Sequence, residues 1–146
     1  MRKCLLVVLL FSFQLFFAQE AAVQKTIETF FEGFHQQDSI KIGSVCDPRM
    51  RLQSVSEQRS VNKLTTDTYS EFIQSIIAIP ETVLFEETIV SYDIKIDGAM
   101  AHVWTPYEFY INGKLSHRGV NSFQLFRENE SSDTWKIIYI VDTRRK

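Results

Sequence analysis

The sequence predicts an α+β fold in which N-terminal helices pack on a twisted antiparallel sheet. The first observation is a helical period of apolar residues in the N-terminal half, and the second is its replacement by long strand-like segments after Pro80. The third is a pair of two-residue hairpin signals, Asp97-Gly98 and Asn112-Gly113, which join successive strands in antiparallel order. Helices followed by a run of hairpin strands are typical of a single α+β domain.

The N-terminal segment has the composition of a secretory signal. Two basic residues precede a nearly unbroken apolar run, Cys4 to Phe17, and Ala18 suits the position before a cleavage site. We therefore expect residues 1–18 to be a signal peptide and residues 19–146 to be one exported domain, periplasmic or secreted. An uncleaved anchor is the alternative. The run is shorter than the about 20 residues of a membrane span, so no stable membrane insertion is expected after processing.

Charge and cysteine content argue against several function classes. Two of the 16 Lys and Arg side chains lie in the predicted signal, so residues 19–146 carry 14 basic against 18 acidic side chains, a net charge of −4. A mildly acidic chain without a basic block is not expected to bind nucleic acid. Cys46 has no second cysteine to pair with after residue 18 and is expected to be a small buried side chain. The three histidines lack metal-site spacing, and no metal or other cofactor is expected.

Two helices are predicted before the first strands. Residues 20–37 have an amphipathic pattern, and His35 near their end is expected to act as a helix-terminal cation. Asp38 is suited to cap a short second helix that stops near Asp47-Pro48. The apolar face of the first helix consists of Val23, Ile27, Phe30, Phe31 and Phe34.

Short strands and a third helix are predicted next. Residues 49–56 and 59–64 are the strand candidates. Thr68 and Glu71 have the spacing of a capping box, and Pro80 ends the helix that they begin. The sheet that follows is predicted to be an antiparallel meander of four strands, at residues 83–96, 99–111, 114–127 and 134–144, with a third hairpin loop from Glu128 to Asp133.

Three stretches carry a resemblance to a known superfamily: residues 99–110, 119–125 and Thr134-Trp135-Lys136-Ile137. With the order of elements, they resemble the nuclear transport factor 2-like superfamily, and most closely its exported bacterial members described as lumazine-binding or polyketide-cyclase-like. The resemblance implies a cone of three helices on a strongly curved sheet, with an internal pocket and sheet-mediated pairing of subunits. The superfamily includes isomerases, dehydratases, hydrolases and binding modules, so it does not imply one chemistry. Its ketosteroid-isomerase-like enzymes use a tyrosine and two carboxylates in the cone, a set that this sequence does not place.

The Asn112-Gly113 turn predicts a candidate catalytic pair. A two-residue turn there makes Glu108 face His117, while Trp104 faces Asn121 and His102 faces Phe123. Cross-strand partners have Cβ atoms about 5 Å apart, so a Glu108 carboxylate could orient the His117 imidazole as a general base.

The next hairpin extends this hypothesis. If Gly119 aligns with Asp142, Arg144 lies beside His117. One sheet face then carries six candidate side chains: Trp104, Glu108, His117, Asn121, Asp142 and Arg144. The opposite face is the more apolar, so the alternative is that the helices cover that face and that Glu108 and His117 form an exposed pair of little energetic weight. The candidate ligand-binding residues are Trp104, Tyr107, Asn121, Phe123, Asp142 and Arg144, of which Tyr107 needs a β-bulge to reach the site.

Two function classes remain from the sequence. The first is an exported module that binds a small, largely apolar ligand in the cone, without robust catalysis. The alternative is a small cofactor-independent enzyme of the isomerase, dehydratase or cyclase type that uses the His117–Glu108 pair. Because both sheet faces carry large apolar residues, a homodimer through the exposed face is expected. A purely structural role is a third reading of the same residues.

Overall fold

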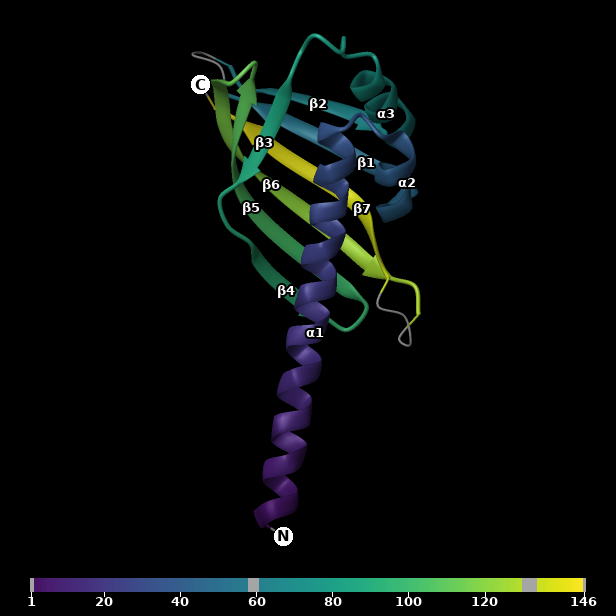
Figure 1. Cartoon of the computed structure of the whole chain (residues 1–146), viewed down its shortest axis with the longest axis vertical. Coiled ribbons are helices and arrows are strands. Elements are labelled where there is room, and N and C mark those ends of the chain that lie inside the picture. The colour runs from purple at the N-terminus through teal and green to yellow at the C-terminus, as the bar shows by residue number, and fades with distance from the viewer. Residues whose placement is uncertain (1, 58–60, 130–133, 146) are drawn as a thin grey trace.

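The computed structural model describes residues 2–57, 61–129 and 134–145, with side chains from Phe17 onward. Within these residues the chain forms three helices and seven strands (Figure 1). The elements in chain order are α1 (Arg2–His35), α2 (Ser39–Val45), β1 (Cys46–Ser56), β2 (Lys63–Thr68), α3 (Tyr69–Ile77), β3 (Phe85–Ile89), β4 (Asp93–Asp97), β5 (Met100–Ile111), β6 (Lys114–Arg127) and β7 (Trp135–Arg144).

The strands form one curved, unclosed sheet with the order β2-β1-β7-β6-β5-β3, and β4 pairs with the other end of β5. All neighbours are antiparallel except β1 and β7, which are parallel. Figure 1 shows α1 crossing the concave side of the sheet, with α2 and α3 together at one end. The predicted α+β fold with helices on an antiparallel sheet is confirmed.

The helix ends follow from local side-chain chemistry. The Asp38 carboxylate accepts from the backbone N–H groups of Ile40 and Lys41, so it caps α2 as predicted. Thr68 and Glu71 form the reciprocal capping box of α3. The helix ends at Ile77, ahead of Pro80.

One predicted strand is in fact two. Residues 83–96 form β3 and β4, which are separated by the segment 90–92. Pro106 of β5 lies opposite this break; it has no N–H to donate to a neighbouring strand, and its carbonyl instead accepts from Val90 N at 2.8 Å. The ladder therefore restarts beyond it in a shifted register.

The hairpin predictions had different outcomes. Asn112 and Gly113 form the β5–β6 turn, both with positive φ, as a tight hairpin turn requires. At the β4–β5 turn, however, Asp97 pairs with Met100, so the two turn residues are Gly98 and Ala99 rather than Asp97 and Gly98. The third predicted loop falls partly on residues 130–133, which lie outside the described residues.

The core lies between the helices and one face of the sheet. Alternate residues of β5, from Ala101 to Tyr107, are at most 2 % exposed, whereas Trp104 on the other face is 45 % exposed. The helices therefore cover the more apolar of the two faces, which the sequence had left open. Cys46 is buried, and that burial raises the pKa of its thiol to about 12.

The first half of α1 extends away from the sheet (Figure 1). Phe17 is 53 % exposed, and among the described side chains of the helix, from Phe17 onward, the first fully buried one is Val23. In the part of the chain with described side chains, no helix is both long and apolar enough to cross a bilayer.

Candidate functional site

A β-bulge in β6 determines which side chains enter the cone. Close to the turn, Ile111 pairs with Lys114 and Tyr110 with Leu115, as a two-residue hairpin predicts. The next pair is Phe109 with His117, so Ser116 has no partner across the ladder. One extra residue on one strand reverses the faces of all residues beyond it.

The predicted pairing of Glu108 with His117 is therefore wrong. Glu108 pairs with Arg118 on the outer face, where the two form an ion pair at 2.7 Å, and it also accepts from the Tyr110 hydroxyl at 2.5 Å. The hydrogen bonds from Tyr110 and Arg118 hold the pKa of Glu108 below its usual range. Glu108 cannot orient the imidazole that the sequence assigned to it.

Two other cross-strand predictions shift for the same reason. Trp104 pairs with Ser122 instead of Asn121, and it lies on the outer face, away from the cone. His102 pairs with Gln124 instead of Phe123, and its Nε2 lies 3.0 Å from the Ser122 hydroxyl. Trp104 thus cannot line the internal cavity that the sequence proposed.

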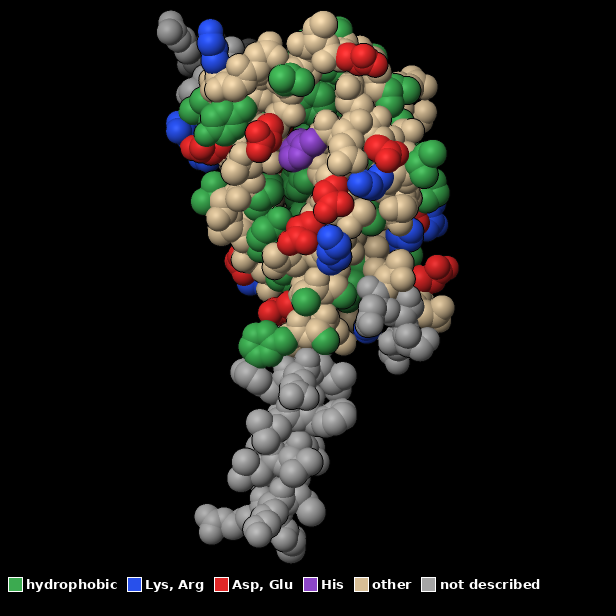
Figure 2. All heavy atoms as spheres, viewed as in Figure 1, with side chains coloured by type: hydrophobic (Ala, Val, Ile, Leu, Met, Phe, Trp, Pro, Cys, Tyr) green, Lys and Arg blue, Asp and Glu red, His purple; other side chains and the backbone are tan. Residues whose placement is uncertain are grey.

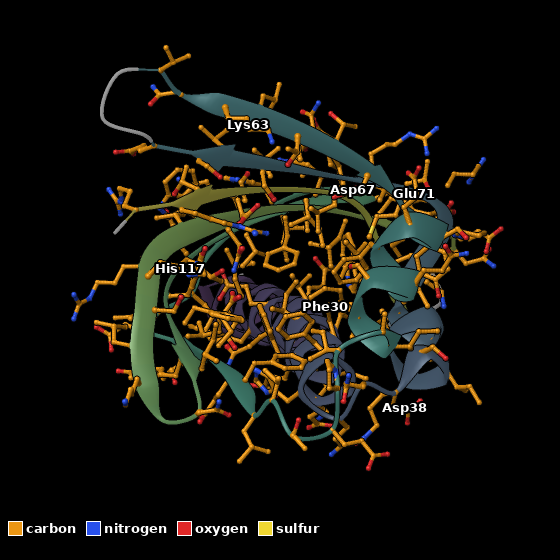
Figure 3. All side chains as sticks on the ribbon, turned by 90° about the horizontal axis from the view of Figure 1, so that it is seen from above. Phe30, Asp38, Lys63, Asp67, Glu71 and His117 are labelled. Carbon is orange, nitrogen blue, oxygen red and sulfur yellow. The ribbon has the colours of Figure 1, made fainter. Side chains whose placement is uncertain are left out.

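The bulge brings His117 and Tyr107 to the inner face together. The His117 ring stacks on Phe109 with centroids 4.8 Å apart, and it meets the Tyr107 ring edge-on at 5.8 Å. Phe123, further along β6, is 1 % exposed and contacts Phe30 and Phe31 of α1. In Figure 3, which looks along the cone, Phe30 lies among the side chains that fill it and His117 lies on the curved strand at one side.

β7 adds a carboxylate and a guanidinium to the same face. Asp142 pairs with Asn121, whereas the sequence hypothesis aligned it with Gly119, so the register differs by two residues. A shift by an even number of residues does not change faces, and both Asp142 and Arg144 therefore face inward. Asp142 is 6 % exposed; its Oδ2 accepts from Arg144 Nε at 2.7 Å. Its Oδ1 is buried and has no hydrogen-bond partner within the described residues. Arg144 also donates to the Ser54 hydroxyl at 3.0 Å.

Glu87 of β3 completes this cluster and was missed at the sequence level. Its Oε1 accepts from Asn121 Nδ2 at 2.6 Å. Burial raises its pKa to about 7; the Asn121 hydrogen bond opposes the rise, and the nearby charge of Asp142 adds to it. A signal was present, because Glu87 stands between Phe85 and Ile89 on the inward-facing positions of a strand.

His35 at the end of α1 holds the backbone of Glu87. Its Nε2 accepts from the Glu87 backbone N–H at 2.9 Å, and its ring stacks against Phe31. Burial lowers the pKa of His35, with Glu86 opposing the change. An imidazole that accepts a hydrogen bond is neutral, so the predicted role as a helix-terminal cation is wrong.

Tyr107 is held in place by a hydrogen bond to β7, and the space for its ring exists because its cross-strand partner is a glycine. Its hydroxyl donates to the Thr143 carbonyl at 2.9 Å and lies 3.5 Å from Asp142 Oδ2. Burial is the largest cause of its raised pKa, and the neighbouring Asp142 and Glu87 charges act in the same direction. A Cβ on Gly119, its cross-strand partner, would come within 1.7 Å of the Thr143 carbonyl oxygen and 2.7 Å of the Tyr107 hydroxyl, so only glycine fits there.

A cavity of about 370 Å³ opens beside this cluster. A narrower extension of about 60 Å³ continues toward Phe30, Asn121 and Phe123, and the two share Phe34, Glu87 and Asp142 in their walls. A larger depression of about 500 Å³ lies beside Leu84 and Tyr110, and its lining does not include Glu87, Tyr107 or Asp142. The cavity lining is mostly apolar, and five of its polar side chains come from β3, β5, β6 and β7: Glu87, Tyr107, His117, Asp142 and Arg144. Asp67 of β2 and Ser75 of α3 also line it.

Among the side chains that the structure describes, from Phe17 onward, no three His, Cys, Asp or Glu residues are placed to bind one metal ion together. On the face shown in Figure 2, acidic and basic side chains are interspersed over the surface.

Comparison with solved structures identifies the fold. An NTF2-like protein from Cytophaga hutchinsonii superposes with a TM-score of 0.67 at 12% identity, covering 87% of this chain and 98% of the other. A candidate dehydratase of the NTF2-like family from Streptomyces avermitilis has a TM-score of 0.63 at 14% identity, over 86% of this chain and 95% of that one.

A third similar structure is the β subunit of a candidate aromatic-ring-hydroxylating dioxygenase from Novosphingobium aromaticivorans. Its TM-score is 0.67 at 8% identity, with 86% of this chain and 88% of that subunit covered. No family model and no curated protein matches the chain. At these identities the likeness establishes the nuclear transport factor 2-like (NTF2-like) fold, which the sequence resemblance predicted, and the function has to be argued from the site.

Proposed function

We propose that this chain, a cone of the NTF2-like fold, binds a small, largely apolar molecule between its helices and its sheet. The observation that carries the proposal is the cavity of about 370 Å³, whose volume lies within the range of small-molecule sites. Its lining is mostly apolar, and Glu87, Asp142 and Arg144 supply polar groups on the sheet side, an arrangement that orients a ligand.

The aromatic wall gives the proposed ligand a rigid contact surface. The Phe34 ring contacts Phe85 at a centroid distance of 5.0 Å and Phe72 at 6.3 Å, and so joins α1 to β3 and α3. Phe109 extends the wall toward His117. Aromatic side chains bury large apolar areas and lose little conformational entropy, so they favour flat apolar ligands.

Naphthalene is a suitable first probe because it tests the apolar walls alone. We expect binding by isothermal titration calorimetry to the full chain, with a negative heat-capacity change. Ser75 of α3 lines the cavity, and a Ser75→Trp substitution should obstruct it and weaken binding about 10-fold or more. Ser70→Trp, on the exposed side of the same helix, is the matched control and should bind as the wild type does. Equal binding by both variants would contradict the proposed location.

A second candidate function is proton transfer at a carbon acid, with Glu87 as the base. Two observations support it: burial raises the pKa of the Glu87 carboxyl to about 7, and Asp142 and Tyr107 lie near that carboxyl in space. These three side chains supply a tyrosine and two carboxylates, the set that the family resemblance implied for isomerases. Glu87 here replaces the His117–Glu108 pair of the sequence hypothesis.

Deuterium exchange into 2-tetralone in D₂O, followed by mass spectrometry, tests this candidate without a known substrate. Exchange should exceed that of buffer, rise as the pH increases through 7, and fall about 100-fold in Glu87→Gln. Glu86→Gln, which removes the adjacent exposed carboxylate, should leave the rate unchanged. Exchange no faster than in buffer alone would exclude Glu87 as a base for this class of ketone.

We further propose export with cleavage after Ala18. Removal of residues 1–18 would leave Val23, Ile27, Phe30 and Phe31, the buried apolar side chains described in α1, in place. N-terminal sequencing of the chain recovered from the periplasm or the medium tests this, and a chain retained in the membrane with residue 1 or 2 at its start would contradict it.

We also propose a homodimer through the outer sheet face. Met100 and Trp104 of β5 are 53 % and 45 % exposed on that side. Light scattering should give twice the mass of one chain, and Trp104→Asp should reduce it to the monomer. A wild-type monomer at high concentration would contradict the proposal.

A further inference from the structure

We propose that the molecule bound in the cone carries a hydrogen-bond donor, an amine or a hydroxyl, at its polar end, and that the site rejects carboxylates. This inference rests on the proposed binding function and names the class of ligand. It follows from the carboxylate oxygens of the cluster that accept no hydrogen bond within the described residues, and from the net charge of the cluster.

Asp142 is the principal acceptor. Its side chain is 6 % exposed and lines both parts of the cavity. Arg144 binds Oδ2, whereas Oδ1 is buried and has no partner within the described residues. A buried carboxylate oxygen without a hydrogen bond is costly, and a donor group on a ligand would satisfy it.

Glu87 presents a second acceptor on the same wall. Asn121 donates to Oε1 at 2.6 Å, and Oε2 receives no hydrogen bond from the described part of the chain. Above about pH 7 the carboxyl is ionised and can only accept. The two acceptors belong to neighbouring side chains, since Asn121 donates to Glu87 and pairs with Asp142, and both carboxyls line the cavity.

Several donors of the cluster, by contrast, are engaged within the protein. Arg144 donates through Nε to Asp142 and through a terminal nitrogen to Ser54. The Tyr107 hydroxyl donates to the Thr143 carbonyl, and Asn121 donates to Glu87. Within the described residues these bonds use two of the five N–H groups of Arg144. At pH 8, however, the Glu87 and Asp142 carboxylates outnumber the single positive charge of Arg144, so an anion is disfavoured relative to an amine or a hydroxyl.

Other titratable groups line the cavity and affect how ligand binding depends on pH. His117 lines the cavity, with its Nδ1 3.2 Å from the Ser116 hydroxyl, and His35 is neutral behind Glu87. The titratable and charged side chains that line the cavity are Glu87 on β3, Tyr107 on β5, His117 on β6, Asp142 and Arg144 on β7, and Asp67 on β2; His35 on α1 contacts the Glu87 backbone.

Three probes that share a naphthalene body test the inference: 2-naphthylmethylamine, 2-naphthylmethanol and 2-naphthoate, each titrated calorimetrically at pH 8. The amine should bind tightest and the alcohol next, with the amine at least about 10-fold tighter than the carboxylate. Affinity for the amine should fall from pH 8 to pH 6 as Glu87 gains a proton, while the alcohol changes less.

Variants identify the acceptors. Asp142→Asn and Glu87→Gln should each reduce the preference for the amine over the carboxylate about 10-fold. Glu86→Gln, adjacent but exposed, should keep the wild-type preference. If Asp142→Asn does not fold, the Glu87→Gln result and the pH dependence decide the question.

The outcomes separate this inference from the function beneath it. If naphthalene binds but 2-naphthoate is the tightest of the three probes, the donor inference is overturned and the binding function stands. If neither naphthalene nor any of the three probes binds, the binding function fails, and the inference fails with it.

Discussion

Two glutamates on neighbouring strands show how the side of the sheet decides the chemistry of a carboxyl group. Glu108 of β5 faces outward, where Tyr110 and Arg118 stabilise its ionised form and lower its pKa. Glu87 of β3 pairs with Phe109, the residue after Glu108 on β5, and faces inward. Burial there raises the pKa of Glu87 to about 7. The residue type is the same, and the difference comes from solvent on one side and aromatic side chains on the other.

The contrast separates a structural ion pair from a candidate site. The outer pair is solvated, and its two charges satisfy each other, so nothing there calls for a ligand. The inner cluster has a titratable carboxyl, a carboxylate oxygen that accepts no hydrogen bond from the described part of the chain, and an adjoining cavity. Groups of the second kind are enriched at functional sites. The four predictions that follow test this contrast between the two faces.

The largest expected effect concerns Gly119, which lies under Tyr107 on the inner face. Gly119→Ala would place a Cβ 1.7 Å from the Thr143 carbonyl oxygen, so β6 and β7 would have to separate. We expect the free energy of unfolding to fall by about 3 kcal/mol, measured by urea denaturation. Lys114→Ala, on the exposed start of the same strand, should change it by less than about 0.5 kcal/mol. Similar values for the two would show that the inner face is not tightly packed there.

Glu87→Gln is expected to stabilise the protein in a pH-dependent way. The folded pKa of Glu87 is raised, so its contribution to stability is fully present below about pH 4.5 and is lost as the pH rises through 7. Glutamine does not ionise and can still accept from Asn121. We therefore expect a gain of about 2 kcal/mol at pH 8 and little change at pH 4.5. Urea unfolding at both pH values measures it, and a loss of stability at pH 8 would contradict the buried position of the carboxyl.

His35→Gln should change the free energy of unfolding on the acidic side of neutral pH, by a smaller amount than Glu87→Gln does at pH 8. The folded pKa of His35 is lowered, so its contribution is fully present above pH 6.5 and declines as the pH falls below that value. Glutamine can accept the Glu87 N–H at any pH. The variant should therefore lose less stability than the wild type between pH 7.5 and pH 5.5. Parallel profiles would mean that His35 does not titrate with folding.

The smallest effect is expected on the outer face. Glu108→Gln removes an exposed ion pair with Arg118. We expect unfolding midpoints within experimental error of the wild type at both pH 8 and pH 4.5, and unchanged binding of naphthalene. A clear loss of binding would restore Glu108 to the site and remove the contrast between the two faces.

Part of the site was within reach of the sequence. Asn121, Asp142 and Arg144 share a face in the predicted and in the observed registers, because the register differs by an even number of residues. Glu108 and Trp104 were placed on that face by extending a two-residue hairpin without the bulge at Ser116. Tyr107 needed that same bulge in order to join His117. Bulges carry no reliable local signal, since they depend on how the sheet curves around its core.

Glu87 shows what local patterns leave out. Its alternation with Phe85 and Ile89 marks an inward position, but its partners come from β6, β7 and the end of α1. Its pKa depends on burial by residues far away in the chain. A carboxyl of this kind is recognised only when those elements are packed together.

The sequence by itself determined the α+β class, the Asp38 cap, the Thr68–Glu71 capping box and the Asn112-Gly113 turn, because each depends on interactions within a few residues. The tertiary structure alone decided which face the helices cover and the register beyond the bulge, and these two features bring Glu87, Tyr107 and Asp142 to one wall of a cavity. The physical reason is that side chains on a strand alternate faces with a period of two, so a single extra residue exchanges the inside and the outside of the cone.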